Sequence, residues 1–303
     1  MKYPQMNKGI TFAFATAIIS GLSIFYSKIA VATIPPLILT TSRNTYVAVL
    51  FVLFFLFTGK ISEIKKLKKS EIFKLALIGV VGGSIPFYLF FTGLKIIGAQ
   101  EANLIHKSLF MWVTLLGFFF LQEKPNLKYI VGFVLVIVAT YFVSPFQLTW
   151  QNGSLMVLAA TLLWSIENMI AKKVLPTVSS EIVGLARMGI GSIVLLGLTF
   201  STGAGGKLLS LDSTALTVIA VGGTLLFGYV YCWYKALKFA PASLVTLILT
   251  FSVVVGTILN GAFAGVKTTM PQIQTAALIA VGTIIASGIS PTKLLAREKA
   301  KNG

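Results

Sequence analysis

Apolar residues occur along this chain in long continuous runs, separated by short polar connections. We distinguish ten runs, each close to the length that spans the hydrocarbon core of a bilayer as an α-helix. Because the apolar positions are continuous rather than alternating, membrane strands are not expected. The predicted fold is therefore an all-α membrane protein, with helices over residues 9–32, 37–58, 72–94, 100–121, 127–144, 153–175, 181–200, 214–237, 243–263 and 271–290.

The second half of the chain repeats the first at an offset of 143 or 144 residues. An internal duplication of hydrophobic helices is the sequence mark of a secondary transporter, with its substrate site between the repeats. We expect one five-helix repeat over residues 1–146 and another over 147–303, the second ending in a short basic tail. Corresponding positions are Gly9 and Gly153, Lys28 and Lys172, Arg43 and Arg187, Asn103 and Thr246, Thr114 and Thr257, and Lys124 and Lys267.

Composition agrees with a chain that lies in lipid. The chain is 56% hydrophobic and only 11% charged, whereas soluble domains carry about 25% charged residues. The first apolar run is long and has no plausible cleavage site, so we interpret it as a retained helix rather than a signal peptide. The single cysteine, Cys232, excludes an internal disulfide and a thiolate metal cluster, and we expect neither a metal nor another cofactor.

The basic residues predict an orientation. With the N-terminus in the cytoplasm, 18 of the 25 Lys and Arg residues fall on the cytoplasmic side and 4 on the other side. Cytoplasmic loops are enriched in these residues, so both termini are predicted to be cytoplasmic and the net charge of +17 does not indicate a nucleic-acid partner. Five helices per repeat is an odd number, so the second repeat is predicted to be inverted relative to the first around a central cavity. We expect a multi-pass protein of the cell membrane, as a monomer or a weak dimer.

Several short motifs follow one another in order along the two halves. In their order, spacing and duplication the chain resembles the EamA-type members of the drug/metabolite transporter superfamily over nearly its whole length. The motifs are Gly93-Leu94-Lys95, Leu121-x-Glu123-Lys124, Ala160-Thr161-Leu162-Leu163-Trp164-Ser165-x-x-Asn168 and Tyr234-x-Ala236-Leu237-Lys238-x-x-x-Ala242.

The resemblance implies a ten-helix fold whose central cavity is lined mainly by the first, third, fourth, sixth, eighth and ninth helices. It also implies transport of small metabolites, often amino acids or related compounds, without fixing the substrate. The first repeat departs from the Trp-Ser-x-x-Asn pattern, because it has Ser20, Gly21 and Ile24 at the corresponding positions. A substrate role carried by that pattern is therefore not expected for the first helix.

Polar residues within the apolar runs are the candidates for a site, because such residues are costly in a membrane unless they face a cavity or a partner. A stripe on the fourth run and its counterpart on the ninth are predicted to face the cavity from opposite sides. The alternative is that they form interhelical hydrogen bonds. The stripes contain Asn103, Lys107, Phe110 and Thr114, with His106 beside them, and Thr246, Thr250, Val253, Thr257 and Asn260.

The sixth run adds Trp164, Glu167 and Asn168 to the predicted substrate site. Glu167 could pair with Lys107 or an arginine, bind a substrate amine, or carry a coupling proton, and His106 is the alternative proton carrier. Arg43 and Arg187, related by the repeat, are assigned a structural or gating role. Some of the aromatic residues Tyr88, Phe91, Tyr231 and Trp233 are expected to form a cavity wall, with packing or interfacial anchoring as the alternative, and Tyr88 and Tyr231 are assigned to the substrate site. The stretch Gly82-Gly83-Ser84-x-Pro86 is predicted to interrupt the third helix.

The sequence thus predicts a secondary transporter that moves a small polar metabolite, an amino acid or a related organic solute, by alternating access. A structural or regulatory membrane protein is the alternative. An intramembrane enzyme is less favoured, because one histidine and one mid-span acid offer little for catalysis. The chain lacks a nucleotide-binding motif, so the expected driving force is an ion gradient, such as a coupling proton, or exchange with a counter-solute.

Overall fold

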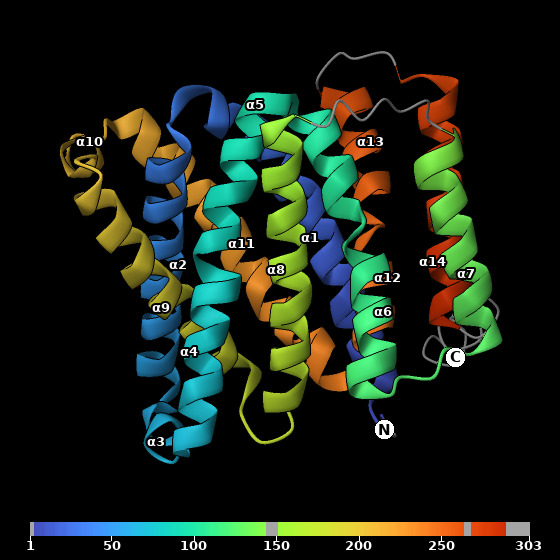
Figure 1. Cartoon of the computed structure of the whole chain (residues 1–303), viewed down its shortest axis with the longest axis horizontal. Helices are drawn as coiled ribbons and strands as arrows, with labels where there is room; N and C mark the ends of the chain where they lie inside the picture. Colours follow the sequence, from blue (N-terminus) through green and yellow to red (C-terminus); the bar gives the residue numbers. More distant parts are fainter. Residues whose placement is uncertain (1–2, 144–150, 264–267, 289–303) are drawn as a thin grey trace, which may run out of the picture.

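The computed structural model describes residues 3–143, 151–263 and 268–288, and the regular structure in these residues is entirely helical (Figure 1). Nine of the described helical segments are long and apolar enough to cross a membrane. The remaining apolar run forms a shorter helix, α7 (Leu127–Val138), which a π-helical stretch, Ala139–Val143, extends. The prediction of an all-helical membrane protein is confirmed, with nine spans of full length and one shorter apolar helix in the described residues.

The first half of the chain forms α1 (Met6–Thr33), α2 (Pro36–Thr58), the short α3 (Ile61–Lys65), α4 (Lys69–Gly83), α5 (Ile85–Lys107), α6 (Leu109–Leu121) and α7. The second half forms α8 (Asn152–Val174), α9 (Ser180–Ser201), the short α10 (Gly205–Leu209), α11 (Ser213–Phe239), α12 (Ala242–Leu249), α13 (Ser252–Phe263) and α14 (Met270–Ser287).

The predicted third and fourth helices are divided differently from expectation. The predicted interruption at Gly82–Pro86 is confirmed, because α4 ends at Gly83 and α5 begins at Ile85. The turn between the two predicted helices lies inside α5, at Gly98, whose φ of 82° and ψ of 163° are not helical. Glycine adopts positive φ without steric cost, so this residue type suits the turn.

Two further breaks occur at corresponding places in the two halves. The fourth predicted helix is broken at Ser108, between α5 and α6, and the ninth at Thr250 and Phe251, between α12 and α13. At both breaks the backbone bonds span three residues: the Ser108 N–H donates to Ile105 O (3.0 Å) and the Thr250 N–H to Leu247 O (3.1 Å). A stretch of such bonds within an α-helix is often a hinge.

The packing of the helices follows the sequence repeat. α1 packs along α11, and the corresponding helix of the second half, α8, packs along α5. In the same way α4 packs on α9 and α11 on α2, while α7 pairs with α14, its counterpart. In Figure 1, α1 begins at the lower end of the bundle and α8 begins at the upper end, so these corresponding helices run in opposite directions.

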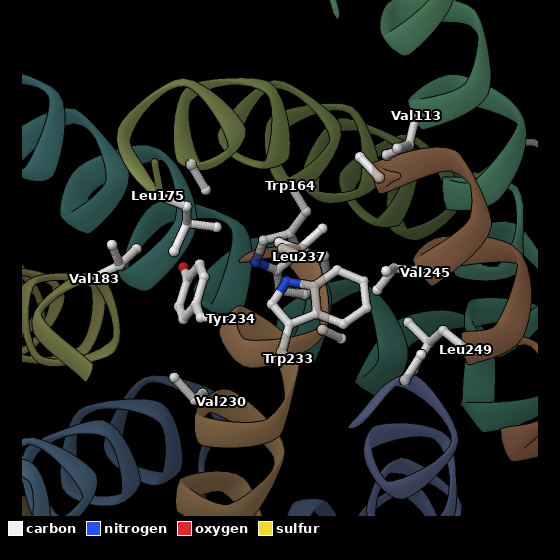
Figure 2. Packing of buried hydrophobic residues seen from close by; sticks show 14 of the residues in the cluster. Val113, Trp164, Leu175, Val183, Val230, Trp233, Tyr234, Leu237, Val245 and Leu249 are labelled. Carbon is white, nitrogen blue, oxygen red and sulfur yellow. The ribbon is translucent and has the colours of Figure 1, made fainter. Parts of the chain in front are cut away.

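Buried side chains from both halves form one large apolar core. Figure 2 shows Trp233 and Tyr234 of α11 within this core, together with Trp164 of α8. Large apolar side chains are also exposed on the outside of the bundle, among them Phe57 (86% exposed) and Phe119 (67%). An apolar outer surface of this kind matches a lipid environment rather than water.

Candidate functional site

A cavity of about 110 Å³ lies at the centre of the bundle, between helices of both halves. Most of its lining comes from α1 and α5 of the first half and from α8 and α11 of the second, and α2 and α9 contribute one arginine each. Nine candidate residues from the sequence border this cavity. They are Arg43, Phe91, Asn103, His106, Trp164, Glu167, Asn168, Arg187 and Trp233.

Two predicted aromatic residues lie outside the lining of this cavity. The lining contains the neighbours of Tyr88 and Tyr231 in sequence, Phe87 and Tyr229 among them. The Tyr231 ring packs instead against Phe227, with ring centroids 6.4 Å apart. A shift of one or two residues turns a side chain by 100° or more around a helix, so the right segments were identified but a different helical face borders the cavity.

Aromatic rings surround the single histidine. The His106 ring lies 4.9 Å from that of Trp164 and 5.3 Å from that of Phe90, between ring centroids. Among the described residues, its side chain makes one polar contact, a long one of 3.5 Å between Nδ1 and Thr161 Oγ1. This wall of the cavity is therefore apolar, with a single imidazole in it.

The break between α4 and α5 is held by donors from three other helices. The carbonyl of Gly82 accepts hydrogen bonds from Trp164 Nε1 (3.0 Å) and Arg187 Nε (3.2 Å). The carbonyl of Gly83 accepts one from Asn44 Nδ2 (2.8 Å). The last carbonyls of a helix lack partners within it, so these bonds satisfy α4 where it ends inside the protein. Arg187 thus helps to cap the C-terminus of α4.

Among the described residues, Glu167 is the single carboxylate in the lining of the cavity, and it is 1% exposed. Its Oε1 accepts a hydrogen bond from Tyr234 Oη (2.6 Å), whereas its Oε2 has no hydrogen-bond partner in the described residues. The one ion pair found among the described residues joins Lys235 and Glu181. The suggested pair between Glu167 and Lys107 is therefore not formed in this structure.

Arg43 differs from its repeat counterpart in its partners. The Arg43 side chain is buried (3% exposed), donates one long hydrogen bond from Nη1 to Ser27 Oγ (3.4 Å), and lies 4.7 Å above the Phe91 ring. Its Nε has no partner among the described residues, whereas Nε of Arg187 donates to Gly82 O. Arg43 thus borders the cavity with a guanidinium that has no carboxylate partner among the described residues.

Serines of α1 form a polar strip beside Arg43. Ser20, Ser23 and Ser27 all border the cavity, and their spacing of three and four residues places them on one face of the helix. Neither Ser23 nor Ser27 was predicted from the sequence as a site residue. The signal was present, because three hydroxyls at helical spacing interrupt an otherwise apolar face.

Lys107 lies in a side chamber of about 20 Å³ that adjoins the cavity. Phe110, Thr246 and Thr250 also line this chamber, and it shares Asn103 and other residues with the cavity. The chamber lies between the two helix breaks, since Lys107 directly precedes Ser108 and Thr250 belongs to the second break. The first parts of the two predicted polar stripes therefore meet here.

The later part of the fourth-helix stripe faces elsewhere. Thr114 shares a hydrogen bond of 2.5 Å with the Tyr129 hydroxyl and borders a groove of about 520 Å³ between α6 and α7. The expectation that Thr114 faces the central cavity is therefore wrong. Later in the ninth-helix stripe, Asn260 donates to Gly256 O of its own helix. The break at Ser108 is the physical reason for the first difference, because it disturbs the regular rotation on which the stripe was based.

The end of the bundle where α1 begins is closed by contacts between the halves. The Glu123 carboxylate, in the connection after α6, accepts hydrogen bonds from the backbone N–H groups of Ala242 (2.7 Å) and Ser243 (3.1 Å), and from Ser243 Oγ (2.6 Å). This carboxylate caps the N-terminus of α12, where free N–H groups and the helix dipole favour a negative charge. All eight residues of α12 are buried.

A lysine of α8 closes the same end from the other side. Lys172 donates from Nζ to the carbonyls of Leu237 (2.6 Å) and Ala240 (2.9 Å), and so caps the C-terminus of α11. Its ammonium also lies 4.6 Å above the ring of Tyr3, a residue that precedes the first helix. Burial, with Glu123 nearby, raises the pKa of the Tyr3 hydroxyl, so the group stays protonated and neutral.

The residues present do not assemble a metal centre within the described part of the chain. No three His, Cys, Asp or Glu side chains lie close enough there to hold an ion. The chemistry that the cavity offers is binding by charge, hydrogen bonds and aromatic contact.

Comparison with known proteins gives a consistent result. The sequence model described as the EamA-like transporter family matches residues 7–144 and 151–288. An "Uncharacterized transporter" of Methanothermobacter thermautotrophicus is 24% identical over 213 residues, and this alignment spans 64% of the chain and 62% of that relative. A protein crystal structure superposes with a TM-score of 0.72 at 17% identity, over 92% of this chain and 96% of the other. That last likeness supports the fold alone.

Proposed function

The chain belongs to the EamA-like transporter family, and on this basis we propose that it is a secondary transporter of a small polar metabolite, an amino acid or a related organic solute. The observation that carries the proposal is the central cavity, which both halves of the chain build together. Secondary transporters made of repeated halves bind their solute at such a junction.

Alternating access is the mechanism that the repeat supports best. Corresponding helices α1 and α8 run in opposite directions, as expected of inverted repeats (Figure 1). In this structure α12 is buried throughout, whereas among the corresponding described residues 101–106 only Ala102 and Ile105 are buried and the other four are partly exposed. We infer a conformation that is closed at the end where α1 begins, and a second conformation in which the two halves exchange these arrangements.

The orientation follows from the basic connections. The excess of Lys and Arg assigns the end where α1 begins, and the loop at 60–70, to the cytoplasm. The closed end is then cytoplasmic, and the solute enters the cavity from the opposite side in this conformation. The protein is a multi-pass protein of the cell membrane.

The proposed substrate contacts come from four helical segments around the cavity and its side chamber. Charged and polar groups fix the solute, and aromatic rings enclose its apolar part. For coupling, Glu167 is the preferred proton carrier over His106, since it forms no ion pair with Lys107. The residues assigned to substrate binding are Asn103, His106, Lys107, Phe110, Trp164, Glu167, Asn168 and Thr250.

Counterflow in liposomes tests the proposal. The purified protein is reconstituted, the liposomes are loaded with one unlabelled solute, and entry of the labelled solute is followed for amino acids and short organic acids in turn. If the protein is a transporter, the labelled solute accumulates transiently inside the liposomes above its outside concentration. The solute extracted from them is then chemically unchanged. Equal entry into liposomes with and without protein, for every solute of the panel, would reject transport.

A further inference from the structure

We propose that the transported solute is a short-chain monocarboxylate anion, with an apolar body and no ammonium group, whose carboxylate binds Arg43 and the neighbouring serines of α1. The inference rests on the proposed transport function and narrows its substrate class. It depends on the charges that line the cavity, on the unequal partners of the two arginines, and on the size of the space.

The cavity and its side chamber have an excess of positive groups. The described residues that line these two spaces include three basic side chains, Arg43, Arg187 and Lys107, and a single carboxylate, Glu167. Buried charges require a counter-charge in contact, since low-dielectric surroundings penalise an isolated ion. An anionic solute reduces this excess, a zwitterion leaves it unchanged and a cation increases it.

Glu167 is the natural counter-charge of Arg187. Both groups contact Tyr234: Glu167 accepts its hydroxyl hydrogen bond (2.6 Å), and the Arg187 guanidinium lies 5.9 Å from the centre of its ring. Both also adjoin the α4 terminus, where Arg187 donates to Gly82 O and a Cβ at Gly82 would lie 2.4 Å from Glu167 Cγ. A substrate ammonium would have to share this one carboxylate with Arg187.

Arg43, like Lys107, has no anion beside it. Arg43 is buried, and among the described residues its Nε has no hydrogen-bond partner and no carboxylate lies within ion-pair distance. Guanidinium groups bind carboxylates through two parallel N–H donors, with geometry that a lysine does not provide. Ser23 and Ser27 border the same part of the cavity and offer hydroxyl donors to a carboxylate held there.

The space limits the rest of the molecule. A cavity of about 150 Å³ lined by apolar residues holds benzene, and this cavity measures about 110 Å³. A solute of roughly four to six non-hydrogen atoms fits by this comparison, because benzene has six and this cavity is smaller. Phe90, Trp164 and Trp233 line the space, so its walls favour an apolar body beside the carboxylate.

Isosteric ligands separate the charge classes. Isobutyrate and alanine have the same number of non-hydrogen atoms and differ by a methyl group in place of an ammonium. Isopropylamine represents the cation. We expect calorimetry on the purified wild-type protein to show isobutyrate binding at least about tenfold more tightly than alanine, and isopropylamine binding least. Equal or tighter binding of alanine, or no binding of either acid, would overturn the inference.

Variants then locate the carboxylate. Arg43→Gln should weaken isobutyrate binding by about tenfold or more, Arg43→Lys should weaken it less, and Lys207→Gln, which removes an exposed cation far from the cavity lining, should leave it unchanged. Full affinity in Arg43→Gln would contradict the assignment. If that variant does not fold, Ser27→Ala provides the second test, with a smaller loss expected and an unchanged affinity counting against the site.

Counterflow assays test the monocarboxylate substrate separately from the transport function on which it rests. Exchange of alanine without binding or exchange of isobutyrate would reject the monocarboxylate while transport stands. Tight isobutyrate binding without flux of any solute would reject transport while the binding site stands.

Discussion

Removal of the Glu123 carboxylate should open the closed end of the transporter. In this structure the carboxylate accepts three hydrogen bonds from the start of α12, at 2.6 to 3.1 Å, and it comes from the other half of the chain. The contact therefore joins the two halves of the chain and stabilises their closed arrangement. Glu123→Ala removes all three bonds and the favourable charge at the helix N-terminus.

The size of the effect follows from helix capping. Loss of an N-cap side chain costs about 1–2 kcal/mol, and Glu123 is partly buried, so solvent screens its charge only in part. If the open state lacks the contact, the closed-to-open ratio falls by the same free energy, which corresponds to a roughly five- to thirtyfold larger open population.

Thiol accessibility measures this population. Thr246 is 1% exposed in the closed end, so a cysteine introduced there in a Cys232→Ala background should react with a soluble thiol reagent only after opening. The reaction rate should rise about five- to thirtyfold when Glu123→Ala is added. Lys124→Gln, at the exposed neighbouring position, is the matched control and should leave the rate unaltered. An unchanged rate in Glu123→Ala would refute the gating role of this contact.

Three further outcomes are expected. Lys107→Met should abolish transport with little change in melting temperature, because the ammonium has no ion-pair partner among the described residues; normal transport would remove Lys107 from the site. In liposomes, Glu167→Gln should lose pH-driven accumulation but retain solute exchange, and intact accumulation would rule this carboxyl out as the proton carrier. Cysteines placed in the loop at 60–70 of a Cys232→Ala protein should resist an impermeant thiol reagent in intact cells, whereas ready labelling would reverse the orientation.

Most of the helical architecture could be predicted from the apolar runs and their repetition. A continuous apolar stretch has few alternatives in a membrane, because every backbone polar group must be satisfied within the segment. The breaks at Ser108 and Thr250 could not be predicted in this way. Neither position carries Gly or Pro, and a hydroxyl that accepts or donates locally is compatible with a regular helix as well as with a hinge.

The charged residues of the site could be predicted from the sequence, whereas its serines could not. Arg43, Glu167 and Arg187 border the cavity. A charged side chain within the membrane is costly unless it faces a cavity or a partner, so this position could be expected without knowledge of its role. Ser23 and Ser27 were not predicted, because serine also occurs in membrane helices where it packs closely against a neighbouring helix and hydrogen-bonds to it. Which aromatic residues face the cavity depends on helix rotation, which tertiary packing sets.

The central claim is that the solute passes through the central cavity. A counterflow assay on a variant whose cavity is filled by a large side chain tests this claim most directly. Ser23 lines the cavity on α1, and Ser23→Trp places a large side chain into a space of about 110 Å³. With a melting temperature and expression close to those of the wild type, this variant should exchange labelled solute no faster than protein-free liposomes, while the wild-type protein accumulates it. Undiminished exchange by a folded Ser23→Trp protein would show that the solute does not pass through this cavity, and would contradict the account.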